Sequence, residues 1–330
     1  MIMTALRPWQ ACLLALSLAI APAAAQTGGA AFPDRPIRLV VPFPPGGGTD
    51  VLARALSGSL GKDLGQPVVV ENRPGASTSL AAEAVAKSPP DGHTLLVGTR
   101  STYVTNGLLY RRMPYDPLKD LQSVAVISRM EMLLVANNAV RAGTARELVE
   151  LIKANPGKMT YASPGIGTPH HLGMELFRDV AGLELTHVPY KGAAQTLQDL
   201  LGERIDVMFL DFATARALVE ANRIKVFGVA SGQRIKGLPD VPTLAEAGYA
   251  GIEALPGWFG ISAPVGLPAE TRATLEKAVS KAMNDAAVLE QLVTAGYTPA
   301  YGGSDEMTRL IVAEQAKWGE IIRSKNISAE

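Results

Sequence analysis

Cysteine is almost absent from the sequence, and its absence excludes several kinds of site. Among 330 residues there is a single cysteine, Cys12, and it lies in an N-terminal segment that we expect to be removed. A mature chain without cysteine has no disulfide, no thiol nucleophile and no thiolate ligand for a metal. About 305 residues remain after Ala25, which is enough to bury a large apolar core and suits two domains.

A hydrophobic run long enough to cross a membrane is also missing. The apolar stretch at residues 11–20 is about half as long as the ~20 residues that a spanning helix needs. It follows the positively charged Arg7 and precedes residues 21–26 (APAAAQ), which offer a cleavage position after Ala25. This is the pattern of a secretory signal peptide, so we expect residues 1–25 to be removed on export to a bacterial periplasm.

Neither sign of charge is in excess. The sequence holds 31 basic and 31 acidic residues, and only Arg7 precedes the expected cleavage position. Affinity for nucleic acids depends on basic patches, so this balance argues against a nucleic-acid partner. Aromatic residues make up only 5% of the chain, which disfavours a site that stacks on sugars.

What the sequence does contain is a regular alternation of strand and helix patterns. Strands are predicted at 37–43, 68–72 and 93–99, with helices at 50–65 and 79–88 between them. This βαβαβ order predicts parallel strands joined by right-handed crossovers. A second series follows, with strands predicted at 123–129, 132–137, 159–163, 185–190, 205–211 and 224–230, and helices at 144–154, 169–182, 193–202 and 213–222. At the start of the first of these helices, Thr144 and Glu147 have the pattern of a capping box.

The C-terminal part returns to helical patterns after a segment rich in proline and glycine. Helices are predicted at about 268–285 and 304–325, after the motif WFGISAP at 258–264. We therefore expect an α/β protein of two domains, one formed by 31–130 together with 250–330 and the other by 131–249.

Two predicted strands are followed by similar loops that contain glycine. PFPPGGGTD occupies residues 42–50, and SPGIGTPHH occupies residues 163–171. Glycine permits positive φ, so that successive amides converge, and the start of the following helix adds unpaired N–H groups and partial positive charge. Ligands of open α/β sheets bind beyond the carboxyl ends of strands, so the two loops predict an anion held in a cleft between two domains.

A nucleotide site does not fit the first loop. A P-loop needs a Lys-Ser/Thr pair after its glycines, which is missing here, and a dinucleotide fingerprint needs glycine where Val51 stands. A tight turn that only packs a helix against a strand stays open as the alternative to binding. Thr168 also has two interpretations, because before Pro169 it has the pattern of a helix N-cap, and its hydroxyl would compete with a ligand for the same N–H groups.

No metal centre, cofactor or catalytic residue is predicted. His170 and His171 are adjacent, and adjacent helical side chains point about 100° apart, so we interpret them as capping or surface residues. The sequence has no G-x-S-x-G motif. Asp211 ends an apolar run at a strand terminus, where it would cap the next helix or accept a hydrogen bond from a ligand ammonium or hydroxyl group.

The order of several motifs resembles one family of receptors. The chain is similar to the solute-binding receptors of the tripartite tricarboxylate transporters, the Bug-type periplasmic receptors, from about Arg35 to Gly248 and more weakly beyond. The similarity is carried by RPIRLVVPFPPGGGTDVLAR, VVVENRPGAS, AEAVAKSPPDGHTLL, YDPLKDL, SPGIGTPHHL, HVPYKGAAQTLQDLLGERIDVMF and LPDVPTLAEAG.

This resemblance implies a type II-like periplasmic binding protein, with two α/β domains that close around one small ligand like a Venus flytrap. It implies a monomer that performs no chemistry and delivers a dicarboxylate, tricarboxylate, acidic amino acid or aromatic acid to membrane permease subunits. Family members hold the ligand carboxylate with backbone amides, hydroxyls and ordered waters. Carried over by position, the implied ligand contacts are Phe43, Pro44, Gly47, Gly48, Ser77, Thr78, Thr99, Ser101, Ser163, Gly165, Gly167, Thr168 and Asp211.

The sequence departs from the family pattern in two places. After RPGA, where members commonly have two small residues and then Asn, this chain has Ser77-Thr78-Ser79, and around Ser101 it replaces S-x-H-A-x-N by STYVTN, which includes Tyr103. The added hydroxyls and the tyrosine suggest a different ligand rather than a different fold. Two other functions stay open: a sensor subunit that reports ligand occupancy to a membrane kinase, and a periplasmic hydrolase or isomerase with Asp211 as its base.

Overall fold

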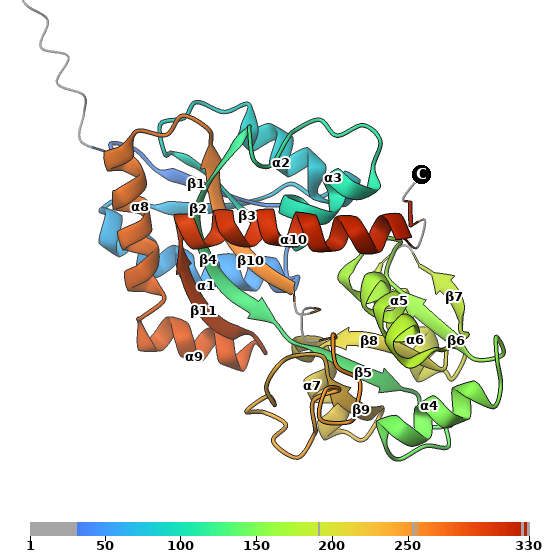
Figure 1. Ribbon diagram of the computed structural model, residues 1–330. Coiled ribbons are helices and arrows are strands. Elements are labelled where there is room, and N and C mark those ends of the chain that lie inside the picture. Colours follow the sequence, from blue (N-terminus) through green and yellow to red (C-terminus); the bar gives the residue numbers. More distant parts are fainter. Residues whose placement is uncertain (1–31, 191, 253–254, 256, 325–326, 329–330) are drawn as a thin grey trace, which may run out of the picture. The chain divides into compact units, whose positions relative to one another are not determined.

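Two β-sheets organise the chain, and each takes its strands from different segments (Figure 1). The computed structural model describes residues 32–190, 192–252, 255, 257–324 and 327–328. The predicted signal peptide and its cleavage position after Ala25 lie outside the described residues. Within the described ranges, no helix is both long enough and apolar enough to span a membrane.

The first sheet has six strands in the order β11-β4-β10-β3-β1-β2. As the βαβαβ pattern predicted, β1 pairs in parallel with both β2 and β3, whereas β10 runs antiparallel to β3 and β4. The C-terminal β10 therefore completes a sheet that the N-terminal strands begin. The strands are β1 (Ile37–Val41), β2 (Val68–Asn72), β3 (Thr94–Thr99), β4 (Leu121–Met130), β10 (Gly257–Pro264) and β11 (Thr298–Gly303).

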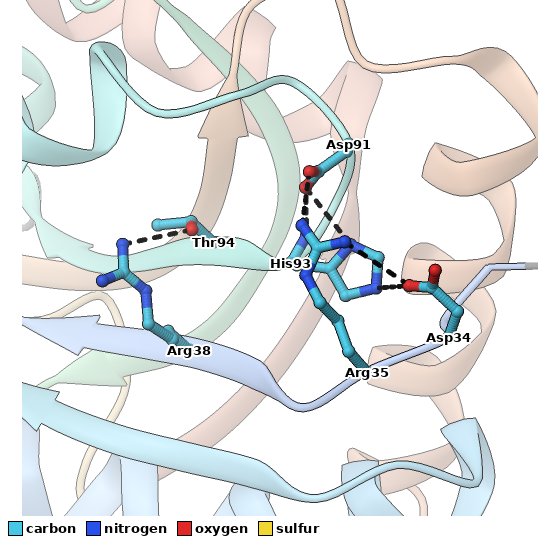
Figure 2. A network of polar contacts seen from close by, with 6 residues as sticks. All are labelled: Asp34, Arg35, Arg38, Asp91, His93 and Thr94. Carbon is cyan, nitrogen blue, oxygen red and sulfur yellow. Dashed lines mark hydrogen bonds and ion pairs between the residues drawn. The ribbon is translucent and has the colours of Figure 1, made fainter.

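Polar side chains fasten the N-terminal ends of β1 and β3 to each other (Figure 2). Arg35 and the backbone amide of His93 both donate to Asp91, at 2.7 Å and 2.9 Å, and His93 Nε2 lies 3.1 Å from Asp34. Arg38 donates to Thr94 on the neighbouring strand at 3.3 Å. His93 is thus placed at the end of the sheet opposite to the glycine loop, which follows the carboxyl end of β1.

Helices cover the first sheet through apolar side chains. Leu52, Leu56 and Leu60 of α1 are fully buried in one cluster with side chains of β1, β3 and α8. Helix α10 packs on β4 and on the short η2. The helical segments of this part are α1 (Gly48–Leu64), η1 (Ala76–Thr78), α2 (Ser79–Ala86), η2 (Ser101–Thr105), α3 (Asn106–Leu109), α8 (Ala269–Ala282), α9 (Ala286–Thr294) and α10 (Ser304–Ser324).

The second sheet has five strands in the order β7-β6-β8-β5-β9. β6 is parallel to β7 and β8, while β5 is antiparallel to β8 and β9. Its strands are β5 (Met132–Ala136), β6 (Thr160–Ser163), β7 (Thr186–Pro189), β8 (Val207–Asp211) and β9 (Lys225–Val229). Its helices are α4 (Ala145–Lys153), α5 (Pro169–Ala181), α6 (Ala193–Leu201) and α7 (Phe212–Glu220).

The chain passes from the first sheet to the second through one residue, Glu131, which separates β4 from β5. It returns after β9, through the segment that leads to β10. Phe32–Glu330 form one compact unit, and a single apolar cluster includes side chains from both sheets, such as Leu96 of β3 and Phe209 of β8. The division into 31–130 plus 250–330 and 131–249 stays a prediction.

One predicted helix is divided into two, and strand β11 and the short segments η1, η2 and α3 were not predicted. The helix expected at 268–285 ends at Ala282, because Asp285 caps a separate helix, α9, by accepting from the Ala287 amide at 2.9 Å. Strand β11 contains Pro299 and two glycines and has an irregular register with β4. An edge strand of this composition has a weak strand pattern, since proline and glycine are depleted from strands.

The predicted capping box at the start of α4 is present. The Glu147 amide donates to the Thr144 hydroxyl at 3.2 Å, and the Glu147 carboxylate accepts from the Gly143 amide at 2.7 Å. Each side chain therefore satisfies an amide at the helix start that would otherwise lack an acceptor. Local capping patterns of this kind determine where the helices begin.

Candidate ligand-binding site

The loop between β1 and α1 presents unpaired backbone amides. Helix α1 begins after Gly47, which is extended (φ −74°, ψ 165°) and has no side chain to cap the helix. Within the described part of the chain, no acceptor faces the N–H groups of Gly48, Thr49 and Asp50. These three donors, together with the partial positive charge of a helix start, suit an anion.

The Asp50 side chain holds this loop in shape. Its carboxylate accepts from the Gly46 amide at 2.9 Å, from Asn72 at 2.9 Å and from Arg54 at 2.9 Å. Asn72 also donates to the carbonyl oxygen of Phe43, one of the predicted ligand contacts, at 3.0 Å. The hydrogen bond from Arg54 lowers the pKa of Asp50 to about 2, with smaller contributions from the Gly46 amide and Asn72.

The glycines of the first loop are needed for different reasons. A Cβ atom on Gly48 would lie 1.8 Å from the Tyr297 hydroxyl, so Gly48 makes room for a side chain of the protein itself. A Cβ atom on Gly47 would meet only the carbonyl oxygen of Pro44, at an ordinary 3.4 Å. Pro44 is exposed. Gly47 is therefore the position where a side chain would enter free space in front of the amides.

The next loop, between β2 and α2, has a strained backbone. Ala76, Ser77 and Thr78 have φ values of +45°, +49° and +81°, although none of them is glycine. Asn106 donates to the carbonyl oxygen of Ser77 and to the Thr78 hydroxyl, and the Thr102 hydroxyl donates to that of Thr78 at 3.0 Å. Consecutive left-handed residues are rare and cluster at functional sites.

Thr99 and Ser101 flank an arginine that anchors their segment. Both predicted contacts are half-buried, Thr99 at the end of β3 and Ser101 at the start of η2. Between them, the fully buried Arg100 donates to Glu314 of α10 at 2.9 Å and to the carbonyl oxygen of Leu255 at 2.9 Å. This segment is thus fixed from behind by α10 and by the chain that enters β10.

The loop between β6 and α5 satisfies most of its own polar groups. The Thr168 hydroxyl caps α5 by accepting from the His171 amide at 3.4 Å, and it donates to the carbonyl oxygen of Gly165 at 2.7 Å. The hydroxyl of the buried Ser163 also approaches the Gly165 oxygen, at 3.2 Å. The Gly167 amide donates to His171 Nδ1 at 3.1 Å. The N-cap interpretation of Thr168 is therefore confirmed, and the hydroxyl also donates a hydrogen bond within its own loop.

A stack of three aromatic rings packs next to this second loop. Tyr161 and His187 stack with ring centroids 4.5 Å apart, and His187 stacks on His171 at 4.3 Å. His187 Nε2 lies 2.8 Å from the Ser163 hydroxyl. Burial lowers the pKa of His171, and burial together with the neighbouring His171 lowers the pKa of His187 to about 4. Both rings are therefore neutral at pH 7.

Asp211 is a helix cap that also faces a histidine. One carboxylate oxygen, Oδ1, accepts from the Thr214 amide at 2.9 Å and from the Thr214 hydroxyl at 2.8 Å, as the N-cap interpretation predicted. The other oxygen, Oδ2, lies 3.8 Å from His170 Nε2. Burial tends to raise the pKa of Asp211, but His170 and Thr214 outweigh it, so that the pKa is lowered overall.

Contacts bring predicted residues from the two sheets close to each other. Tyr297 lies against Gly48 of the first loop, and its pKa is raised by burial and by the nearby charge of Asp211. Gly167 of the second loop lies against Leu109 of α3, where an added Cβ atom would come within 2.2 Å of the leucine. The sequence analysis did not single out Asp50, Asn106 or Tyr297.

A cavity of about 860 Å³ is lined by none of the predicted contacts. It includes Glu131, the single residue between β4 and β5, and the flanking Arg129 and Ser231. Tyr297 borders it as well as the first glycine loop. Among the described residues, no three His, Cys, Asp or Glu side chains gather in a way that could hold a metal ion.

The sequence matches the profile described as "Tripartite tricarboxylate transporter family receptor" over residues 52–327. Three solved structures are similar. "R. palustris Rpa4515 with adipate" is 36% identical with a TM-score of 0.82, over 90% of this chain and 99% of that chain. "Structure of periplasmic binding protein BugD" is 30% identical with a TM-score of 0.79, over 90% and 99%. "MatC (Rpa3494) from Rhodopseudomonas palustris with bound malate" is 31% identical with a TM-score of 0.76, over 88% and 100%.

These likenesses, together with the two mixed sheets, confirm the expected fold class. The chain has the α/β, two-domain, type II-like fold of periplasmic binding proteins. The likenesses do not test which residues hold a ligand, so the contacts carried over from the sequence pattern stay predictions.

Proposed function

Because this chain belongs to the receptor family of the tripartite tricarboxylate transporters, we propose that it captures a small carboxylate in the periplasm and delivers it to the permease subunits of such a transporter. The family resemblance seen in the sequence is thereby confirmed. Relatives with bound adipate and malate support a carboxylate as the ligand. In this proposal the protein is a monomeric receptor without catalytic activity, and residues 1–25 are its signal peptide.

The observation that carries the proposal is the start of α1. Three amides without acceptors among the described residues follow Gly47, and the predicted contacts include no lysine or arginine. A carboxylate has two oxygens and a single negative charge, which these amides and the helix dipole can match. The loop that contains Ser77 and Thr78, which is held in a strained conformation, supports a second set of contacts from the same sheet.

The proposed domain division gives the capture a mechanism. Residues 31–130 with 250–330 supply the first glycine loop, and residues 131–249 supply the second loop and Asp211. Closure of the two around the ligand would exclude water and strengthen each hydrogen bond to it. Any polar group of a wrong ligand left unpaired in the closed site would weaken binding, which provides selectivity.

A melting-temperature screen with small carboxylates tests the proposal. A ligand present at 100 times its Kd adds ~2.7 kcal/mol to the free energy of unfolding, which gives a clear shift. The variant Gly47→Ala should lose the ligand-dependent shift and keep the melting temperature of the free protein, because its methyl group meets no atom closer than 3.4 Å.

Gly58→Ala is the matched control. Gly58 lies on the exposed side of the same helix with open space around it, so the alanine should leave ligand binding unchanged. It should stabilise α1 by roughly 0.5–1 kcal/mol. Undiminished binding by Gly47→Ala would show that the ligand does not approach these amides.

A further inference from the structure

An acidic side chain lies close to the loop that we assign to an anion. We propose that the ligand is a small carboxylate whose far end carries a hydrogen-bond donor, an ammonium or a hydroxyl group, which Asp211 accepts in an acceptor pocket formed with His170 and Tyr297. This inference rests on the proposed function and specifies the class of ligand for the same site. It makes a second carboxylate at that end unfavourable.

The two oxygens of Asp211 have different roles. Oδ1 is committed to α7, since it accepts two hydrogen bonds from Thr214. Oδ2 has no hydrogen-bond donor within reach in the described ranges, and the nearby ring nitrogen, His170 Nε2, lies 3.8 Å away, beyond hydrogen-bond distance. The carboxylate is therefore held in place by one oxygen and can accept a ligand donor with the other.

His170 adds a second polar group without a partner. Its side chain is 14% exposed, and its Nδ1 atom is buried with no hydrogen-bond partner among the described residues. When the proton sits on Nε2, which faces Asp211, Nδ1 is an acceptor. A buried acceptor that lacks a donor costs free energy, and a ligand ammonium or hydroxyl would remove that cost.

Tyr297 connects this acceptor pocket to the amides of the first loop. Its hydroxyl lies against Gly48, where an added Cβ atom would come within 1.8 Å of the hydroxyl oxygen. Its ring is fixed by burial and by an edge contact with Phe259, with centroids 5.4 Å apart. The residue before it, Gly296, packs against Ala213 of α7, two positions after Asp211, because a Cβ atom on Gly296 would lie 2.4 Å from the Ala213 Cα atom. One side chain thus borders both ends of the proposed site, which limits the ligand to a short molecule.

Charge decides between the classes of ligand. A carboxylate beside Asp211 would place two like charges in a partly buried site, where each disfavours the ionised form of the other. An ammonium group would instead be attracted by Asp211, and a hydroxyl would be neutral but would still donate. The same pocket therefore selects for a donor and against a second acid.

Isothermal titration calorimetry at pH 7 with matched ligands tests this inference. Each probe has one carboxylate, a chain of two, three or four methylene groups, and a far end that is carboxylate, ammonium, hydroxyl or methyl; glutarate, 4-aminobutyrate, 4-hydroxybutyrate and pentanoate form the series with three. We expect the best ammonium or hydroxyl ligand to bind at least about tenfold more tightly than the diacid and the methyl compound of equal length.

The variant Asp211→Asn should reverse this order. Asparagine is as good an N-cap as aspartate, so the start of α7 should stay intact. It removes the charge, so the diacid should gain and the ammonium ligand should lose, each by about tenfold. Glu220→Gln is the control, because it removes one charge from the same helix at an exposed position and should leave the ratio unchanged.

The outcomes separate this inference from the proposed function. If diacids bind as tightly as the donor ligands and Asp211→Asn leaves the ratio unchanged, the acceptor pocket is refuted while carboxylate capture stands. If no carboxylate of any type binds, the proposed function is refuted and this inference with it. Circular dichroism of Asp211→Asn confirms that the variant is folded before its affinities are compared.

Discussion

The two glycine loops are alike in sequence and opposite in their hydrogen bonding. At the β1–α1 loop, Gly47 cannot cap the helix, and three successive amides have no acceptor among the described residues. At the β6–α5 loop, Thr168 caps the helix, Pro169 has no N–H group, and the Gly167 amide is accepted by His171. The first loop is open to an anion, whereas the second has largely satisfied itself.

This difference shows that a run of glycines before a helix does not define an anion site. What matters is whether a side chain of the protein already occupies the amides. A Thr-Pro pair supplies a cap and removes a donor, so it leaves fewer amides for a ligand than the neighbouring glycines suggest. In the first loop the threonine comes after the glycines, inside the helix, and its hydroxyl is not placed to cap.

The largest expected effect is on the free energy of unfolding, from the side chain that holds the β1–α1 loop in shape. Asp50→Ala should lower the free energy of unfolding at pH 7 by about 2–4 kcal/mol, because it removes a buried carboxylate that accepts from Gly46, Asn72 and Arg54. Urea denaturation measures this difference. The difference should shrink as the pH falls from about 3.8 toward 2, since the carboxylate, whose pKa is lowered, stabilises the fold only while it is ionised.

Asp305→Ala is the matched control for this prediction. Asp305 is also an acid in the first turn of a helix, but it is exposed, so its loss should cost less than about 1 kcal/mol. Equal losses for the two variants would mean that Asp50 acts only through the helix dipole.

A smaller effect on stability is expected when the N-cap in the β6–α5 loop is removed. Thr168→Ala should lower the free energy of unfolding by about 1 kcal/mol, the usual value of an N-cap. Because the hydroxyl already donates to Gly165 and accepts from His171, ligand affinity should change less than about threefold. Thr168→Ser keeps the hydroxyl and should restore stability. A much larger loss of affinity, with unchanged stability, would instead make Thr168 a ligand contact.

The smallest effect is a loss of stability in acid that is confined to the surroundings of the β6–α5 loop. His187 has a pKa of about 4 in the folded protein, below its ordinary value of about 6.5, because of burial and the neighbouring His171. Between these values the unfolded chain binds a proton that the folded chain does not. The contribution is therefore fully present above about pH 6.5 and is lost as the pH falls toward 4.

We expect this loss to be less than about 1 kcal/mol at pH 5, because solvent screens a partly exposed ring. Hydrogen exchange is the measurement that distinguishes the loops. Between pH 7 and pH 5, after correction for intrinsic exchange, the Gly167 amide should lose protection while that of Gly46 should not. A His187→Asn variant should flatten the response, and equal changes at both amides would contradict it.

Local patterns were sufficient to predict much of the fold. The caps at Thr144, Thr168 and Asp211 depend on residues within three positions of each other, and all three are present. The parallel strands β1, β2 and β3 follow from the βαβαβ order. Where the pattern was weak, as in β11 with its proline and glycines, the strand was missed.

The candidate site depends on contacts that no local pattern reveals. Tyr297 reaches Gly48 across about 250 positions of the sequence, and Asn106 fastens Ser77 and Thr78 from another loop. The sequence suggested that the glycines admit a ligand, whereas Gly48 is small because of Tyr297. His170 was interpreted as a surface or capping residue, and its place beside Asp211 follows from two loops that fold together.

The left-handed run at Ala76, Ser77 and Thr78 has a consequence for the speed of capture. Each such residue costs roughly 1–2 kcal/mol of backbone strain. Hydrogen bonds from Asn106 and Thr102 help to offset this cost in the folded protein before any solute binds. In the proposed function, a solute that diffuses in therefore meets a loop whose conformation is already fixed. The protein loses little conformational entropy in ordering this loop when the ligand binds. A larger share of encounters should therefore lead to a complex than with a flexible loop.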